Sequence, residues 1–175
     1  MTPPETTPAN PVGDPCPACP WDTLEPDGAG LSVHDFLTTL FSHTSNALRR
    51  AITVPYAEQF GLSVSEWRML SVLAHTGSLP FPRLVAESAA DKAQVSRTLS
   101  TLTERGLVSV EVPPAGRKGM VCHMAPKGKA LYEKVMPHAQ RTQAAMILTL
   151  EPEVRRTLYA VLKQLQAQCE ETEVN

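Results

Sequence analysis

The stretch DKAQVSRTLSTLTERGLV, residues 91–108, carries the start and stop signals of a helix. Asp91 stands where an N-cap residue belongs, and Gln94 at the third helical position can complete a reciprocal, capping-box-like exchange with it. Gly106 is a natural stop just past the last turn. The stretch therefore predicts one helix between Asp91 and Gly106.

The two sides of this helix differ in character. At 100° per residue, its apolar residues Val95, Leu99 and Leu102 fall on one side, within about 60° of one another. The opposite side carries small and hydrogen-bonding residues, namely Ala93, Ser96, Arg97, Ser100 and Thr101, with Gln94 at its edge. The pattern predicts a helix that is buried along one side and presents a small, neutral-to-basic face on the other.

Two further helices are predicted before this one. GLSVSEWRMLSVLAHTG (61–77) has Ser63 as N-cap and Glu66 three residues later, which is the spacing of a capping box. LPFPRLVAESAA (79–90) predicts a short helix started by Pro82, with Leu84 and Val85 buried. The capped helix thus follows a shorter one across a tight turn.

Two strands are predicted after it. LVSVEV (107–112) alternates apolar and polar residues with period two, and GMVCHM (119–124) is a plausible partner. The connection PPAGRK (113–118) is rich in proline and glycine and has a basic tip. The order of short helix, turn, capped helix and basic hairpin indicates a winged helix-turn-helix, in a mainly α fold whose only sheet is a small β-hairpin wing.

The second helix of such a unit enters the DNA major groove, which is wide enough for one α-helix. Small residues on its face permit close approach, and Gln94 and Arg97 have the amide and guanidinium that pair with base edges. A basic wing tip suits the minor groove or the backbone. The predicted DNA-binding residues are Lys92, Ala93, Gln94, Ser96, Arg97 and Ser100 on the helix and Arg117 and Lys118 on the wing.

Charge is unevenly distributed along the chain. The net charge is −2, but residues 80–130 hold eight lysines and arginines against four acids. Residues 1–30 hold eight prolines and five acids with no lysine or arginine, which predicts a disordered acidic tail. A basic central block between acidic ends fits a segment that meets a polyanion.

Long amphipathic helices are predicted on both sides of the winged segment, at 31–58, 126–148 and 152–170. Pro55 implies a bend or stop near the end of the first. Their apolar surface exceeds what one small winged unit can cover, so a two-fold homodimer is expected. The predicted organisation is a tail (1–30), a dimerisation helix (31–60), the winged domain (61–125) and C-terminal dimerisation helices (126–175).

The segments GLSVSEWRMLSVLAHTG and LVAESAADKAQVSRTLSTLTERGLV, with the hairpin after them, resemble the MarR family of bacterial transcriptional regulators. The resemblance covers about residues 31–170. It implies a homodimer with one winged unit per subunit, which represses a promoter at an inverted-repeat operator and is often released by a small aromatic acid. The family's wing acid is replaced by Gly116, and its Leu-Thr pair after the hairpin by Met124-Ala125.

In such dimers the first helix borders a cavity, and this chain offers polar groups there. His43, Asn46 and Arg50 fall within about 60° of one another on that helix, and Trp67 and Arg68 come from the second. A planar carboxylate could place its anion on Arg50 and its ring against the apolar wall. The alternative is that the stripe is the solvated side of the helix and that Trp67 belongs to the core.

Other chemistry finds less support. CPAC (16–19) has the spacing of a redox motif or of half a zinc site, and no second cysteine pair follows it. The alternative function is therefore an oxidant- or metal-responsive regulator of the same fold that uses Cys16 and Cys19. Cys122 and His123 are neighbours on a strand and point to opposite faces. No nucleophile–base pair, phosphate loop or membrane-length apolar run is present, so we expect no enzyme, no cofactor and a cytoplasmic location.

Overall fold

A computed structural model of the chain describes residues 19–88, 90–112 and 119–174. Contacts divide it into two compact units, Ala47–Ala145 and a second unit formed by Met1–Asn46 with Met146–Asn175. Among the described residues, the unit Ala47–Ala145 contains all of the buried apolar core, including Leu70, Leu73 and Leu102. Each unit is described by itself below.

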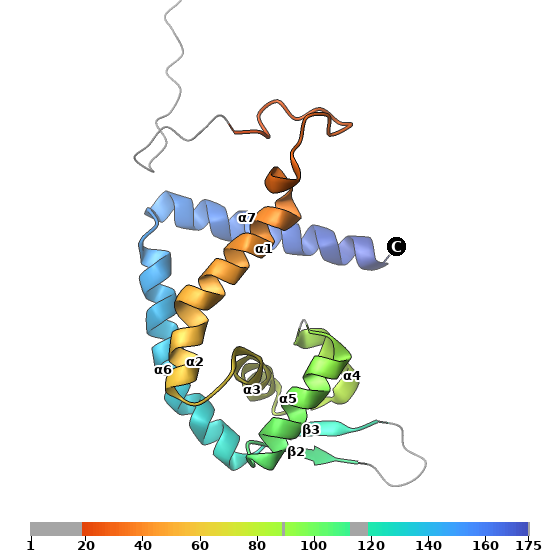
Figure 1. Ribbon diagram of the computed structural model, residues 1–175, viewed down its shortest axis with the longest axis vertical. Coiled ribbons are helices and arrows are strands. Elements are labelled where there is room, and N and C mark those ends of the chain that lie inside the picture. The colour runs from red at the N-terminus through yellow and green to blue at the C-terminus, as the bar shows by residue number, and fades with distance from the viewer. Residues whose placement is uncertain (1–18, 89, 113–118, 175) are drawn as a thin grey trace, which may run out of the picture. The chain divides into compact units, whose positions relative to one another are not determined.

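Three helices form the centre of the unit Ala47–Ala145 (Figure 1): α3 (Val64–Thr76), α4 (Phe81–Glu87) and α5 (Lys92–Glu104). The capping box predicted for α3 is confirmed, because the Ser63 hydroxyl accepts from the Glu66 N–H and the Glu66 carboxylate accepts from the Ser63 N–H. Leu84 on α4 is fully buried, as predicted, whereas Val85 is half-buried. The helix-turn-helix order read from the sequence is therefore present.

The sheet has three antiparallel strands in the order β1-β3-β2, one more than the predicted hairpin. Strands β2 (Val108–Glu111) and β3 (Val121–Met124) pair with Val110 opposite Cys122. The extra strand β1 (Ser78–Pro80) pairs with β3 and takes up the start of the 79–90 segment, and α4 begins at Phe81, one residue before the Pro82 that was predicted to start it. Proline is tolerated there because β1 is an edge strand.

The helix predicted over 31–58 is divided. A 3-10 turn (Val33–Asp35) precedes α1 (Leu37–Leu48), a π-helical turn η2 (Arg49–Thr53) follows, and α2 (Val54–Gln59) ends the segment. In the π turn the Val54 N–H bonds to the Arg49 carbonyl five residues back. Pro55, which has no N–H to donate, stands in the first turn of α2. The helix therefore continues past Pro55, with a π-helical turn in front of it.

The two C-terminal helices are α6 (Pro126–Leu148) and α7 (Pro152–Val174), which start where the sequence predicted. Pro126 begins α6 without an N–H to satisfy. Gly128 is buried against the chain that links α5 to β2: a Cβ added to it would lie 2.0 Å from the Leu107 carbonyl oxygen. Only glycine permits this approach of α6 to the end of α5.

Candidate nucleic-acid interface

Both ends of α5 are fixed by local hydrogen bonds. At the start, the Asp91 carboxylate accepts from the Gln94 N–H at 2.8 Å, as predicted. At the end, the Leu107 N–H bonds to the Leu102 carbonyl and the Gly106 N–H to the Thr103 carbonyl, with Gly106 at φ 69°. This pair of bonds is the Schellman motif, which ends a helix on a left-handed glycine.

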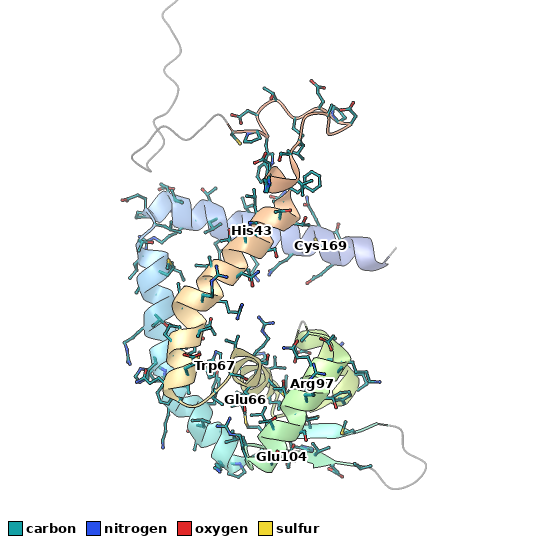
Figure 2. All side chains as sticks on the ribbon, in the orientation of Figure 1. His43, Glu66, Trp67, Arg97, Glu104 and Cys169 are labelled. Carbon is teal, nitrogen blue, oxygen red and sulfur yellow. The ribbon has the colours of Figure 1, made fainter. Side chains whose placement is uncertain are left out.

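The predicted division of α5 into two sides is confirmed. Val95, Leu99 and Leu102 are at most 4% exposed and pack in the core. The outward face is exposed at Lys92, Ala93, Ser96, Arg97 and Ser100. Figure 2 shows Arg97 on α5, on the side away from α3. At 100° per residue these five positions span about 140°, a face that is continuous over the first three turns.

Gln94 is the exception among the predicted DNA-binding residues of α5. Its side chain is half-buried, and its amide Nε2 donates to the Ser65 hydroxyl on α3 at 2.9 Å. The reciprocal half of the expected capping-box-like exchange is therefore not made, because the Gln94 amide is directed to α3 instead of back to Asp91. Gln94 belongs to the contact between the two helices in this structure.

One acid interrupts the basic character of the outward face. Glu104, in the last turn of α5, is exposed and accepts a hydrogen bond from the Ser100 hydroxyl at 3.1 Å. Figure 2 shows it at the end of α5 nearest the sheet. A carboxylate repels phosphate, so the part of α5 suited to meet DNA is its N-terminal half.

A buried acid joins α3 to the C-terminal end of α5. The Glu66 carboxylate, which accepts from the Ser63 N–H in the α3 capping box, also pairs with Arg105, with the guanidinium N 2.5 Å from Oε1. Burial alone raises the pKa of the Glu66 carboxyl, but the hydrogen bonds from Ser63 and the ion pair with Arg105 outweigh it and lower the pKa below its ordinary value. Lys127 on α6 donates to the Arg105 carbonyl at 2.8 Å. This three-element clamp holds the orientation of α5.

The sequence did not indicate this clamp, because it joins residues 39 positions apart. The available sequence signal is an acid in the first turn of one helix and an arginine at the C-terminal end of a later helix. The predicted wing residues Arg117 and Lys118 lie outside the described residues. The strands that lead to them are in place, with His123 and Glu111 3.4 Å apart across the pair.

The predicted effector residues are distributed over both units. His43 and Asn46 are exposed on α1, and Arg50 is exposed in the π turn. His43 contributes to a shallow hollow with Thr38, Thr39 and Ser42. Trp67 is 8% exposed in the core of the other unit. Its ring stacks on Tyr132 at 5.4 Å between centroids and meets the edge of Tyr56 at 5.7 Å.

Arg68 alone among the five lines a pocket between α3 and α5. The pocket measures about 200 Å³. Its polar lining consists of Arg49, Ser65, Arg68, Ser88, Gln94 and Thr98, and Met69 and Val95 are among its apolar residues. The arginine that joins Arg68 there is Arg49, one position before the predicted Arg50.

Other groups that could carry chemistry are scattered. Within residues 19–88, 90–112 and 119–174, no three His, Cys, Asp or Glu side chains are grouped so as to hold a metal. Cys19 and Cys169 are exposed, whereas burial raises the pKa of the Cys122 thiol; Cys16 lies outside the described residues. None of the described helices combines the length and apolar character that a membrane crossing requires.

Comparisons with known proteins converge on one family. Residues 60–119 match the model of the MarR family. A Thauera aromatica protein, named as a candidate transcriptional regulator of the hcr operon, is 26% identical over 115 residues, covering 66% of this chain and 69% of the relative.

Solved structures share the fold. NadR in complex with 4-hydroxyphenylacetate has a TM-score of 0.64 at 22% identity, over 77% of this chain and 94% of NadR. A mutant of MarR from E. coli, complexed with operator DNA, has a TM-score of 0.65 at 18% identity, over 74% and 92% of the two chains. With its capped α3, its α5 face and its three-stranded wing sheet, the chain has the winged-helix fold of these proteins and is similar to transcriptional regulators of the MarR family.

Proposed function

We propose that this protein is a homodimeric cytoplasmic repressor that binds an inverted-repeat DNA operator and is released by a small aromatic carboxylic acid. The observation that carries the proposal is the outward face of α5, which is exposed, small and basic at its N-terminal half. A helix about 10–12 Å across fits a major groove about 12 Å wide. The Asp91 cap and the Glu66–Arg105 pair hold α5 in one orientation in the DNA-free protein.

Dimerisation is supported by large apolar side chains that stay exposed in the described part of a single chain. Helix α1 has no buried residue, and Phe36 just before it and Leu37, Leu40 and Phe41 on it are each 40–41% exposed. On α7, Leu158 and Val161 are each 44% exposed and Tyr159 is 66% exposed. Several large apolar residues that stay exposed along two helices indicate an interaction surface. We assign it to a second copy of the chain, with residues 31–60 and 126–175 as the dimerisation helices.

The dimer gives a geometric prediction. Two α5 helices related by a two-fold axis should read half-sites whose centres are about 10 bp apart. Sedimentation should show a dimer at micromolar concentration, and a gel shift on the region upstream of the protein's own gene should give one retarded complex. A monomer in sedimentation, or no shift on any genomic fragment at physiological salt, would contradict the proposal.

The effector is supported by NadR, whose crystal structure contains 4-hydroxyphenylacetate, and by arginines placed beside apolar surface in this chain. Two locations compete for the acid. One is the stripe of His43, Asn46 and Arg50 predicted from the sequence, and the other is the pocket at Arg68. Aromatic acids added to the gel shift should release operator DNA, and Arg50→Ala distinguishes the two locations because Arg50 does not line the pocket.

Glu104 gives a second test of the α5 face. Replacing it in Glu104→Gln removes a negative charge that faces the phosphates, so affinity should rise by up to about 5-fold for operator and random DNA alike. The increase should shrink as salt is added, because the charges are exposed. Fluorescence anisotropy at two salt concentrations measures this, with Glu133→Gln on α6 as the control. A loss of affinity restricted to the operator would instead make Glu104 a base-reading residue.

A further inference from the structure

One hydrogen bond joins the first turns of α3 and α5. Ser65 is the second residue of α3, and Gln94 is the third residue of α5. The amide Nε2 of Gln94 donates to the Ser65 hydroxyl at 2.9 Å, and both residues are half-buried. The backbone N–H of Gln94 donates to the Asp91 carboxylate at 2.8 Å. Gln94 is therefore held at its backbone by the cap of its own helix and at its side chain by α3.

The bond to Ser65 keeps the Gln94 amide away from the outward face of α5. At 100° per residue, Gln94 stands about 130° from the middle of that face and about 60° beyond its nearest member, Arg97. Thr98, four residues after Gln94, lies on the same flank, is also half-buried and lines the same pocket between α3 and α5. The amide nitrogen of Gln94 thus lies on the flank of α5 that packs against α3.

A glutamine amide can read a base with two hydrogen bonds. In the major groove its oxygen and its nitrogen pair with the exposed edge of adenine, so both atoms must face the groove. Gln94 has a second amide N–H, but the bond to Ser65 holds the nitrogen on the side of α3. An adenine contact therefore requires that this bond break. The free energy of the bond is subtracted from any preference for adenine that Gln94 could give.

We propose that Ser65 is a positioning residue that sets the base preference of α5, because it withholds the Gln94 amide from one base pair of each operator half-site. One hydrogen bond of this kind is worth a factor of about 2–10 in population. The Ser65 hydroxyl lowers the population of a groove-facing amide by that factor, and it lowers the preference for adenine accordingly. The effect on base preference rests on the proposed function, whereas the bond itself does not.

The bond is tested first in the DNA-free protein. NMR on isotope-labelled full-length protein follows the exchange of the Gln94 side-chain amide protons with water. Ser65→Ala should speed this exchange several-fold, because the amide loses its acceptor, whereas Ser65→Thr keeps a hydroxyl and should exchange at the wild-type rate. Ser71→Ala is the matched control: Ser71 is also half-buried on α3, but its hydroxyl donates to the Trp67 carbonyl of the same helix. Equal exchange in wild type and Ser65→Ala would overturn the proposal.

Base preference is then measured with DNA. Wild type, Ser65→Ala and Ser71→Ala are each carried through selection from a random duplex library, and the base preference at every position of the enriched motif is compared. In Ser65→Ala the preference for adenine should rise by about 2- to 10-fold at one position of each half-site, with the other positions unchanged. Ser71→Ala should enrich the wild-type motif. Added to Gln94→Ala, the Ser65→Ala change should have no further effect on base preference, because the reading amide is gone.

The outcomes separate base reading from a structural role. A general loss of α5 positioning in Ser65→Ala would lower the preference at all positions and would not depend on Gln94, and this result would overturn the proposal. An identical motif in wild type and Ser65→Ala would also overturn it, because the released amide would then not reach a base, and the proposed function would still stand. If wild type itself enriches no motif, the proposed function fails, and the inference about base preference fails with it.

Discussion

Arg97→Ala is expected to lower the preference for operator over random DNA by about 1–3 kcal/mol, which is about 5- to 150-fold in affinity ratio. Arg97 lies on the outward face of α5, exposed and on the side away from α3 (Figure 2). Among the described residues, the Arg97 side chain makes no ion pair. Its guanidinium is therefore available for a bidentate contact to guanine. Competition anisotropy with operator and random duplexes measures the ratio.

The matched control for this variant is Arg156→Ala. Arg156 is an exposed arginine on α7, in the other unit, where it pairs with Glu153. Its removal takes away the same charge without touching α5, so the affinity ratio should stay at the wild-type value. An unchanged ratio in Arg97→Ala as well would show that this face of α5 does not read bases.

Glu66→Ala is expected to lower the free energy of unfolding by about 2–4 kcal/mol. The change removes the acceptor of the Ser63 N–H in the α3 capping box and leaves Arg105 without its partner, and the Glu66 side chain is 9% exposed. The expected loss of stability is smaller than for a fully buried ion pair, because the Arg105 side chain is 35% exposed and reaches solvent. Urea unfolding at equal protein concentration measures the loss, since dimer stability depends on concentration.

Glu153→Ala is the control, because Glu153 also pairs with an arginine but is 83% exposed. Its loss should cost less than about 1 kcal/mol.

The pH dependence of stability tests the Glu66 contacts a second time, in the wild-type protein. The pKa of Glu66 is lower in the folded state than in the unfolded chain, so its contribution is present above the unfolded pKa and is lost as pH falls through the folded one. Wild type should therefore lose more stability than Glu66→Ala when acidified below the ordinary pKa of glutamate. Equal losses in both would show that the Glu66 contacts do not stabilise the fold.

The elements of the winged unit could be predicted because their signals are local. Ser63 with Glu66, Asp91 with the Gln94 N–H, and Gly106 each act within four residues, and each appears in the structure as expected. Strand β1 was missed because three residues that end in proline carry no periodicity, and the strand forms only against β3.

The side-chain contacts that shape the site were less predictable. The Glu66–Arg105 and Gln94–Ser65 pairs join residues 39 and 29 positions apart, which no local spacing indicates. The stripe of His43, Asn46 and Arg50 assumes 100° per residue, and the π turn at Arg49–Thr53 departs from that angle. The arginine of this turn that lines the pocket between α3 and α5 is Arg49. The sequence also could not indicate that the Ser88 hydroxyl is buried without a hydrogen-bond partner among the described residues, because this depends on how the turn before α5 packs.

Selection from a random duplex library tests whether the two α5 helices of one dimer read DNA. Purified full-length protein is incubated with the library at physiological salt, bound duplexes are amplified over several rounds, and the product is sequenced. We predict enrichment of an inverted repeat whose half-site centres are about 10 bp apart. The Arg97→Ala variant should enrich it much less. A product with no common motif, or single half-sites without symmetry, would contradict DNA reading by a two-fold dimer.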